Sequence, residues 1–113
     1  MPHPRDPQKY LSDMLDRANF VVEVLVKRSR MELDSDRLLR SAIERELSIL
    51  GEALYQLHQA EPKLAEKIDN WREIIRFRHV LVHGYSVLNM DMIWDVVRDD
   101  LPGLIGQLET LLN

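Results

Sequence analysis

The chain of 113 residues contains no cysteine. Disulfide bonds and thiolate metal sites are therefore excluded, and the composition suits a reducing compartment, so we expect a cytoplasmic protein. The apolar runs are only a few residues long, far below the ~20 that a membrane-crossing helix needs, so no membrane association is expected. The proline-rich start predicts an extended lead-in over residues 1–6 and no signal peptide.

An excess of positive charge is also missing. The chain has 15 Lys and Arg against 19 Asp and Glu, a formal net charge of −4. A protein that coats nucleic acid carries the opposite balance. An enzyme that cuts RNA is compatible with this composition if its basic residues are gathered in one place.

Glycine is scarce, and no stretch alternates apolar and polar residues as a strand does. Apolar residues recur instead at spacings of three and four. This pattern predicts helices over residues 7–28, 35–60, 62–68, 71–83 and 90–112. Pro102 should interrupt the last of these, and a loop is expected through residues 31–34. The fold class is therefore all-α, an antiparallel helical bundle of four main helices plus a short extra helix, in a single domain over residues 1–113.

Two predicted helices carry clear apolar stripes, and the longest one also contains a glycine. The stripes are Leu11, Leu15, Ala18, Val22 and Leu25 in the first helix, and Leu39, Ile43, Leu47, Leu50, Leu54 and Leu57 in the second. Gly51 lies in the middle of the second, where glycine costs about 1 kcal/mol relative to alanine. We interpret Gly51 as a point where another helix approaches closely.

The helix predicted over residues 71–83 carries the basic residues. Arg72, Arg76, His79 and His83 are spaced four, three and four apart, so they fall within about 60° of one another on its surface. Such a stripe faces either acidic residues of another helix or a polyanion. A solvated basic face is the ordinary interpretation, and composition alone favours it.

The two histidines of this stripe permit two chemistries. His79 and His83 are four residues apart and could bind one metal ion, but no third ligand is adjacent and no His-Glu-x-x-His motif exists, so no metal is expected. General acid–base catalysis by His83 has better support, because imidazole titrates near neutral pH. Arg78 precedes His83 by five residues, and Tyr85 follows it by two.

Helix geometry separates the candidate arginine from the candidate base. Arg78 lies about 140° around an ideal helix from His83, so the two side chains do not lie side by side. Either the helix ends before His83, with Gly84 as the breaker, or a second subunit completes the site.

The motif and its surroundings resemble a known family. Arg78-x4-His83-x-Tyr85 resembles the Arg-x4-His-x-Tyr signature of the HepT-like toxins, which have the HEPN fold. The likeness extends over most of the chain, through Trp71-Arg72-Glu73-Ile74-Ile75, Tyr10-Leu11-x2-Met14-Leu15, Leu47-Ser48-Ile49-Leu50-Gly51-Glu52-Ala53, Ile93-Trp94-Asp95 and Asp100-Leu101-Pro102. His79 stands where these proteins typically have Asn, and Arg76 stands where the residue is often small.

The resemblance implies a homodimer in which two motifs meet in a shared cleft and cleave RNA without a metal or other cofactor. It also implies the toxin half of a toxin–antitoxin system. The antitoxin would be a MntA-like nucleotidyltransferase that neutralises the toxin by transferring AMP to Tyr85. A structural or RNA-stacking tyrosine is the simpler alternative at that position.

RNA chemistry supplies a mechanism for such a site. The ribose 2′-hydroxyl can attack the adjacent phosphate, giving a 2′,3′-cyclic phosphate. Arg78 and His83 are the candidate catalytic residues: His83 would move the proton, and Arg78 would hold the phosphate. The auxiliary RNA-binding residues would be His79, Arg76 and Arg72. Two alternatives remain: an inactive helical dimer that binds and positions a nucleotidyltransferase, and a structural bundle whose basic stripe pairs with acidic helices.

Overall fold

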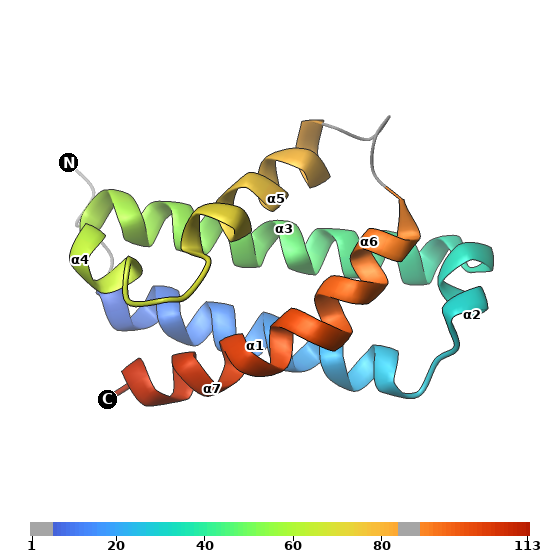
Figure 1. Cartoon of the computed structure of the whole chain (residues 1–113), viewed down its shortest axis with the longest axis horizontal. Helices are drawn as coiled ribbons and strands as arrows, with labels where there is room; N and C mark the ends of the chain where they lie inside the picture. Colours follow the sequence, from blue (N-terminus) through green and yellow to red (C-terminus); the bar gives the residue numbers. More distant parts are fainter. Residues whose placement is uncertain (1–5, 84–88) are drawn as a thin grey trace.

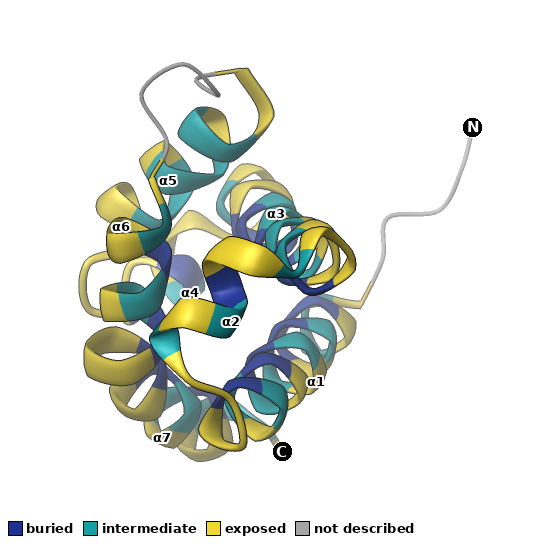
Figure 2. Cartoon of the chain, turned by 90° about the vertical axis from the view of Figure 1, so that its right-hand side faces the viewer, coloured by how far each residue is buried: buried dark blue, intermediate teal, exposed yellow. Residues whose placement is uncertain are grey.

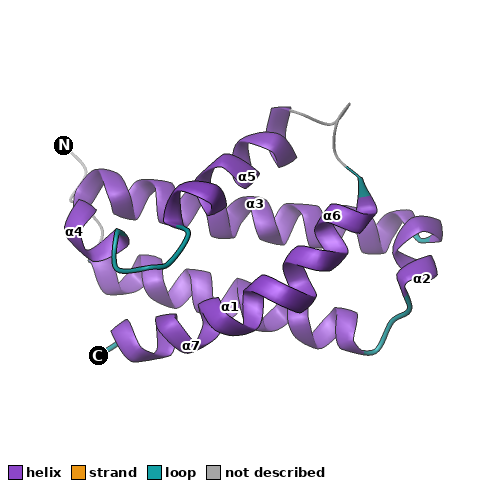
Figure 3. Cartoon of the chain, in the orientation of Figure 1, coloured by secondary structure: helices purple, strands orange, loops and turns teal. Residues whose placement is uncertain are grey.

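The computed structural model describes residues 6–83 and 89–113, and every regular element in these ranges is helical (Figure 3). Two long helices, α1 and α3, lie beside a shorter α5 and a column formed by α6, η1 and α7, while α2 and α4 are short connecting helices (Figure 1). The predicted all-α bundle of four main helices is confirmed. The bounds are Pro7–Val26 for α1, Arg30–Ser35 for α2, Arg37–Ala60 for α3, Pro62–Ala65 for α4, Trp71–His83 for α5, Met90–Asp95 for α6, Val96–Asp100 for η1 and Leu101–Leu111 for α7.

Helix α1 begins as its sequence predicts. The Asp6 carboxylate accepts a hydrogen bond from the Gln8 backbone N–H at 2.9 Å, and Pro7 occupies the first turn, where its missing N–H costs nothing. Of the predicted stripe, Leu15 and Val22 are half-buried at the edge of the core. The buried face of α1 consists of Tyr10, Leu11, Met14, Ala18, Val21 and Leu25.

The prediction of a loop over residues 31–34 is wrong, because these residues belong to α2. Ser29 and Glu32 form a capping box: the Ser29 hydroxyl accepts from the Glu32 N–H, and the Glu32 carboxylate accepts from the Ser29 N–H, both at 3.2 Å. Leu33 is fully buried. Capping and burial together stabilise a helix too short to show an apolar period.

Helix α3 is the central element of the bundle. All six residues of its predicted stripe are buried, and Asp36 caps its start by accepting from the Leu39 N–H at 3.1 Å. Figure 2 shows the buried sides of α1, α3 and α7 facing one another, with α5 outside this layer. One side of α3 therefore contributes to the core while another supports α5.

The connection from α4 to α5 differs in detail from the prediction. Helix α4 ends at Ala65 instead of near Ile68, although Ile68 is fully buried. The Asp69 carboxylate accepts from the Gln107 side chain at 3.1 Å, and the Asp69 N–H donates to the same side chain at 2.8 Å. Asn70 adopts a left-handed φ of 61°, a conformation that asparagine tolerates well. This turn joins the start of α5 to α7.

The hydrogen-bonding pattern of the column formed by α6, η1 and α7 changes just before Pro102. Residues Val96–Asp100 form a π turn, and the Leu101 N–H donates to the Val96 carbonyl. Proline cannot donate to the carbonyl four residues earlier and clashes with it, so a wider turn at this point lets the helix continue. The column divides into two α-helices near Pro102, as predicted, but it is not broken there, because the π turn joins α6 to α7 without a gap. The column buries Ile93, Val97, Leu101, Leu104 and Leu108.

Helix α5 is the least embedded main helix. None of its residues is buried, although several pack half-buried against the core (Figure 2). Within residues 6–83 and 89–113, no helix is long and apolar enough to cross a membrane. The fold thus presents α5, which carries the candidate residues, on the outside of α3.

Candidate active site

Helix α5 comes very close to α3 at Gly51. A Cβ atom placed on Gly51 would lie 2.5 Å from the Cβ and 3.2 Å from the Cγ of Arg78. This is closer than real Cβ atoms come, so a side chain at position 51 would push α5 away. The predicted role of Gly51 as a point of close helix approach is confirmed, and its partner is the candidate arginine itself.

The Arg78 side chain is held by residues of α3. Its Nε donates to the Glu52 Oε2 at 2.7 Å, and its guanidinium carbon lies 5.2 Å from the centre of the Tyr55 ring. Gln56 donates to the other Glu52 oxygen at 3.0 Å. The pKa of Glu52 is lowered, first by the hydrogen bond from Gln56 and also by Arg78, against a desolvation that raises it. Arg78 is therefore paired with a carboxylate that stays ionised.

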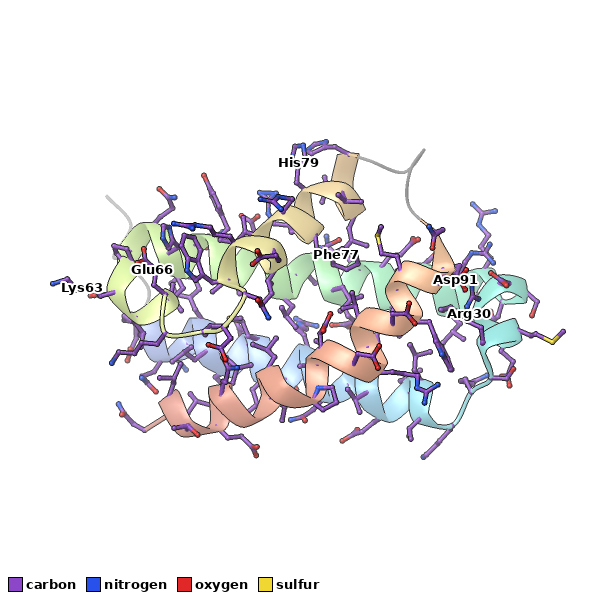
Figure 4. All side chains as sticks on the ribbon, viewed as in Figure 1. Arg30, Lys63, Glu66, Phe77, His79 and Asp91 are labelled. Carbon is purple, nitrogen blue, oxygen red and sulfur yellow. The ribbon has the colours of Figure 1, made fainter. Side chains whose placement is uncertain are left out.

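The basic stripe is exposed along its whole length. Arg72, Arg76, His79 and His83 are all exposed, and neither arginine forms an ion pair with a carboxylate of the described residues. The imidazoles of His79 and His83 lie 4.9 Å apart, centre to centre. Figure 4 shows His79 at the outer edge of α5, directed away from the bundle. The stripe was expected to face either acidic residues of another helix or a polyanion. Within the described residues, no acidic helix of the same chain pairs with its arginines, so a polyanion is the alternative that remains.

One chain does not bring Arg78 and His83 together. Helix α5 remains helical through His83, so the explanation that it ends before His83 is wrong. No hydrogen bond joins the two side chains, and Arg78 is directed toward α3 while His83 is exposed. What remains of the sequence interpretation is a site completed by a second subunit.

The base of α5 is fastened by a stack that sequence reasoning did not identify. The His58 ring stacks on Trp71 at 4.3 Å, nearly parallel, and His58 Nε2 lies 2.9 Å from the Glu66 carboxylate. Arg72 lies over the Trp71 ring at 4.9 Å. These contacts link α3, α4 and α5, and thereby fix where the basic stripe begins.

A groove of about 660 Å³ lies beside α5, and Arg76 of the basic stripe contributes to its lining. Its wall includes apolar residues such as Phe77, Val80 and Leu104, while four carboxylates contribute to its lining: Asp69, Glu73, Asp99 and Asp100. Negative charge repels a phosphate backbone, so this groove is a poor surface for RNA. The outer face of α5 is the better candidate.

The remaining expectations concern metal and tyrosine. Among the described residues, no group of three or more His, Cys, Asp or Glu side chains is arranged to hold a metal ion. Tyr85, the expected modification site, and Gly84, the expected helix stop, lie outside the described residues.

Sequence reasoning identified the members of α5 but not their partners on α3. Glu52 appeared there as part of a family-like segment, and Tyr55 and His58 were not singled out. A weak signal existed, because Glu52, Tyr55 and Gln56 are spaced three and four apart beside Gly51. Their link to Arg78 is a tertiary contact across 26 residues of chain.

Comparison with known proteins gives a consistent result. The model of the family described as "Ribonuclease HepT-like" matches residues 14–111. A protein of Methanocaldococcus jannaschii named "Putative RNase" is 30% identical over 107 residues, covering 93% of this chain and 95% of that protein. The "Probable ribonuclease HepT" of Thermococcus cleftensis is 29% identical over 107 residues, covering 95% and 96% of the two chains. No solved structure matches significantly. The chain therefore belongs to the HepT-like ribonuclease family.

Proposed function

We propose that this protein is a metal-independent endoribonuclease whose catalytic residues are Arg78 and His83. The observation that carries the proposal is the exposed stripe of α5, which places two neighbouring imidazoles and two arginines without carboxylate partners on one face in a chain of a ribonuclease family. In a chain with a net charge of −4, this stripe is a local concentration of positive charge suited to a phosphate backbone.

The reaction needs no protein nucleophile. The ribose 2′-oxygen attacks phosphorus, the bond from phosphorus to the 5′-oxygen breaks, and the products are a 2′,3′-cyclic phosphate and a 5′-hydroxyl. His83 takes the 2′ proton or protonates the leaving oxygen, and Arg78 stabilises the additional negative charge on the phosphate. His79, Arg76 and Arg72 bind the flanking backbone.

A homodimer explains how the two catalytic groups act on one phosphate. They lie on different sides of an unbroken α5, so a site that uses both needs either a substrate that reaches around the helix or a second α5. Helix α5 buries none of its residues in one chain, and Val82 on its outer face is 49% exposed. We infer that the α5 helices of two copies face each other and that Arg78 of one chain acts with His83 of the other.

The first test compares wild type with His83→Ala on total RNA in the presence of a chelator. Proton transfer contributes about 10²–10⁴-fold to a rate, so the variant should lose cleavage by that order. Circular dichroism of His83→Ala serves as the control for folding, because His83 is exposed and its removal should leave the bundle intact. Equal cleavage by wild type and His83→Ala would refute the proposal, as would a loss of cleavage on chelation.

A mixing experiment tests the shared site. Arg78→Ala and His83→Ala should each be inactive, but their mixed dimer contains one site with both residues intact. Random exchange of subunits makes half of the dimers mixed, each with one of two sites restored, so activity should recover to about a quarter of wild type. No recovery, despite subunit exchange demonstrated with tagged chains, would contradict a site built from both chains.

The biological setting follows from the resemblance. We propose that the protein is the toxin of a toxin–antitoxin pair and that a MntA-like nucleotidyltransferase neutralises it by attaching AMP to Tyr85. Tyr85 is two residues from His83, so an added nucleotide phosphate would bring negative charge to the RNA-binding face. Intact-mass spectrometry after co-expression with the nucleotidyltransferase of a neighbouring gene should show the adduct in wild type and not in Tyr85→Phe. Neutralised toxicity without an adduct would refute this part.

A second function is favoured by one observation, the ion pair between Arg78 and Glu52. Such a pair also serves a helix that is merely anchored, as in an inactive dimer that positions a nucleotidyltransferase. The two functions differ in the first test, because the scaffold predicts no RNA cleavage by wild type and intact binding of the partner by His83→Ala.

A further inference from the structure

We propose that Glu52 is a positioning residue for the nuclease reaction, orienting the Arg78 guanidinium so that its two terminal nitrogens face the scissile phosphate. This inference rests on the proposed function and adds a residue of α3 to it. Arg78 makes three contacts with α3: with the helix backbone, with the Glu52 carboxylate and with the Tyr55 ring.

The first step is the placement of the Arg78 stem. Because position 51 has no side chain, the Cβ and Cγ of Arg78 lie directly against the backbone of α3. The stem is thus held at its root, and the Arg78 side chain is only 21% exposed. An arginine with so short a free length has few alternative positions for its head group.

The second step concerns which nitrogen Glu52 uses. The carboxylate binds Nε, at 2.7 Å, rather than the terminal pair. Among the described residues, neither terminal nitrogen of Arg78 has a hydrogen-bond partner. A guanidinium forms forked hydrogen bonds through its edges, so a carboxylate on Nε leaves the terminal edge available for two phosphate oxygens. Glu52 therefore does not compete with the phosphate for that edge.

The third step is that the carboxylate is itself fixed. Gln56 donates to Oε1 while Arg78 donates to Oε2, so the two oxygens of Glu52 have separate partners. The Tyr55 ring lies beside the guanidinium and limits its rotation. The plane of the Arg78 head group is thus set by three side chains of α3 before any RNA binds, which is the preorganisation that transition-state stabilisation requires.

The test is Glu52→Gln, compared with wild type in steady-state cleavage of a defined RNA. The amide oxygen still accepts a hydrogen bond, so the fold should be kept, but the charge-assisted bond that orients Nε is lost. Small misplacement of a catalytic group costs up to about 10²-fold, and we expect kcat to fall by about 10-fold with KM changed less than 2-fold. Glu52→Ala should cost more.

The matched control is Glu46→Gln. Glu46 also lies on α3 and forms a comparable ion pair with Arg17 of α1 at 2.9 Å, away from α5. It should leave kcat unchanged, although it removes a bridge between helices just as Glu52→Gln does. In an Arg78→Lys background, where Nε is absent, Glu52→Gln should have no further effect on kcat.

The outcomes separate this inference from the nuclease proposal. If wild type and His83→Ala cleave equally, the nuclease proposal fails and the role of Glu52 falls with it. If wild type cleaves and folded Glu52→Gln retains kcat, the positioning role is refuted while the nuclease stands. It is also refuted if Glu52→Gln and Glu46→Gln lower kcat equally, or if Glu52→Gln lowers kcat by the same factor in the Arg78→Lys background.

Discussion

The contact between α3 and α5 can be tested with alanine at two glycines of opposite surroundings. Gly51→Ala places a Cβ atom 2.5 Å from the Cβ of Arg78, and 3.4 Å from its Cα. These atoms belong to the root of a side chain and to backbone, so no rotation of Arg78 relieves the overlap. Helix α5 must move away from α3. Gly106 is also inside a helix, α7, but a Cβ there meets nothing within 4 Å.

The expected magnitudes have opposite signs. Within a helix, replacing glycine by alanine stabilises by about 1 kcal/mol when nothing else changes. Gly106→Ala should show a gain of about this size. At Gly51 the same gain is opposed by overpacking, which typically costs about 1–3 kcal/mol. The net effect of Gly51→Ala is a loss of up to about 2 kcal/mol, so the two variants should differ by about 1–3 kcal/mol.

Urea denaturation followed by circular dichroism measures both free energies of unfolding. Linear extrapolation with comparable slopes for the variants would show that the native states and not the denatured states differ. Gly51→Ala should also lower RNA cleavage, because it displaces Arg78, while Gly106→Ala should not. If Gly51→Ala stabilised the protein as much as Gly106→Ala, the close approach of α5 at this position would be refuted.

Three further predictions concern the fold and its response to acid. Ser29→Ala should destabilise by about 1 kcal/mol through loss of the capping box of α2, measured by urea denaturation; an unchanged midpoint would contradict the cap. Leu54→Ala should cost about 2–5 kcal/mol because Leu54 is fully buried, and a loss below that range on the same assay would show that the core can collapse around the gap. The folded-state pKa of Glu52 lies below its ordinary value of 4.5, so its contribution is present above that pH and is lost as the pH falls below it. The thermal unfolding temperature should therefore fall more steeply between pH 7 and pH 3 in wild type than in Glu52→Gln. Parallel curves for the two proteins would refute a stabilising contribution from ionised Glu52.

Local signals predicted most of the helices because they act within a few residues. The cap at Asp6, the proline at position 7 and the apolar period of α3 all specify where helices begin and which side is buried. The helix α2 escaped prediction because it has six residues, too few to show a period, and its capping box at Ser29 was not used.

Spacings of three and four residues are enough to predict that the chain is a helical bundle and that α5 carries a stripe of arginines and histidines. The direction of the Arg78 side chain depends on the packing of α3 against α5, because Gly51, Glu52 and Tyr55 reach it through contacts between distant segments that no local period encodes. The folded structure also shows that α5 stays helical to His83 and stays on the surface. For that reason, one chain alone keeps its candidate arginine and histidine apart.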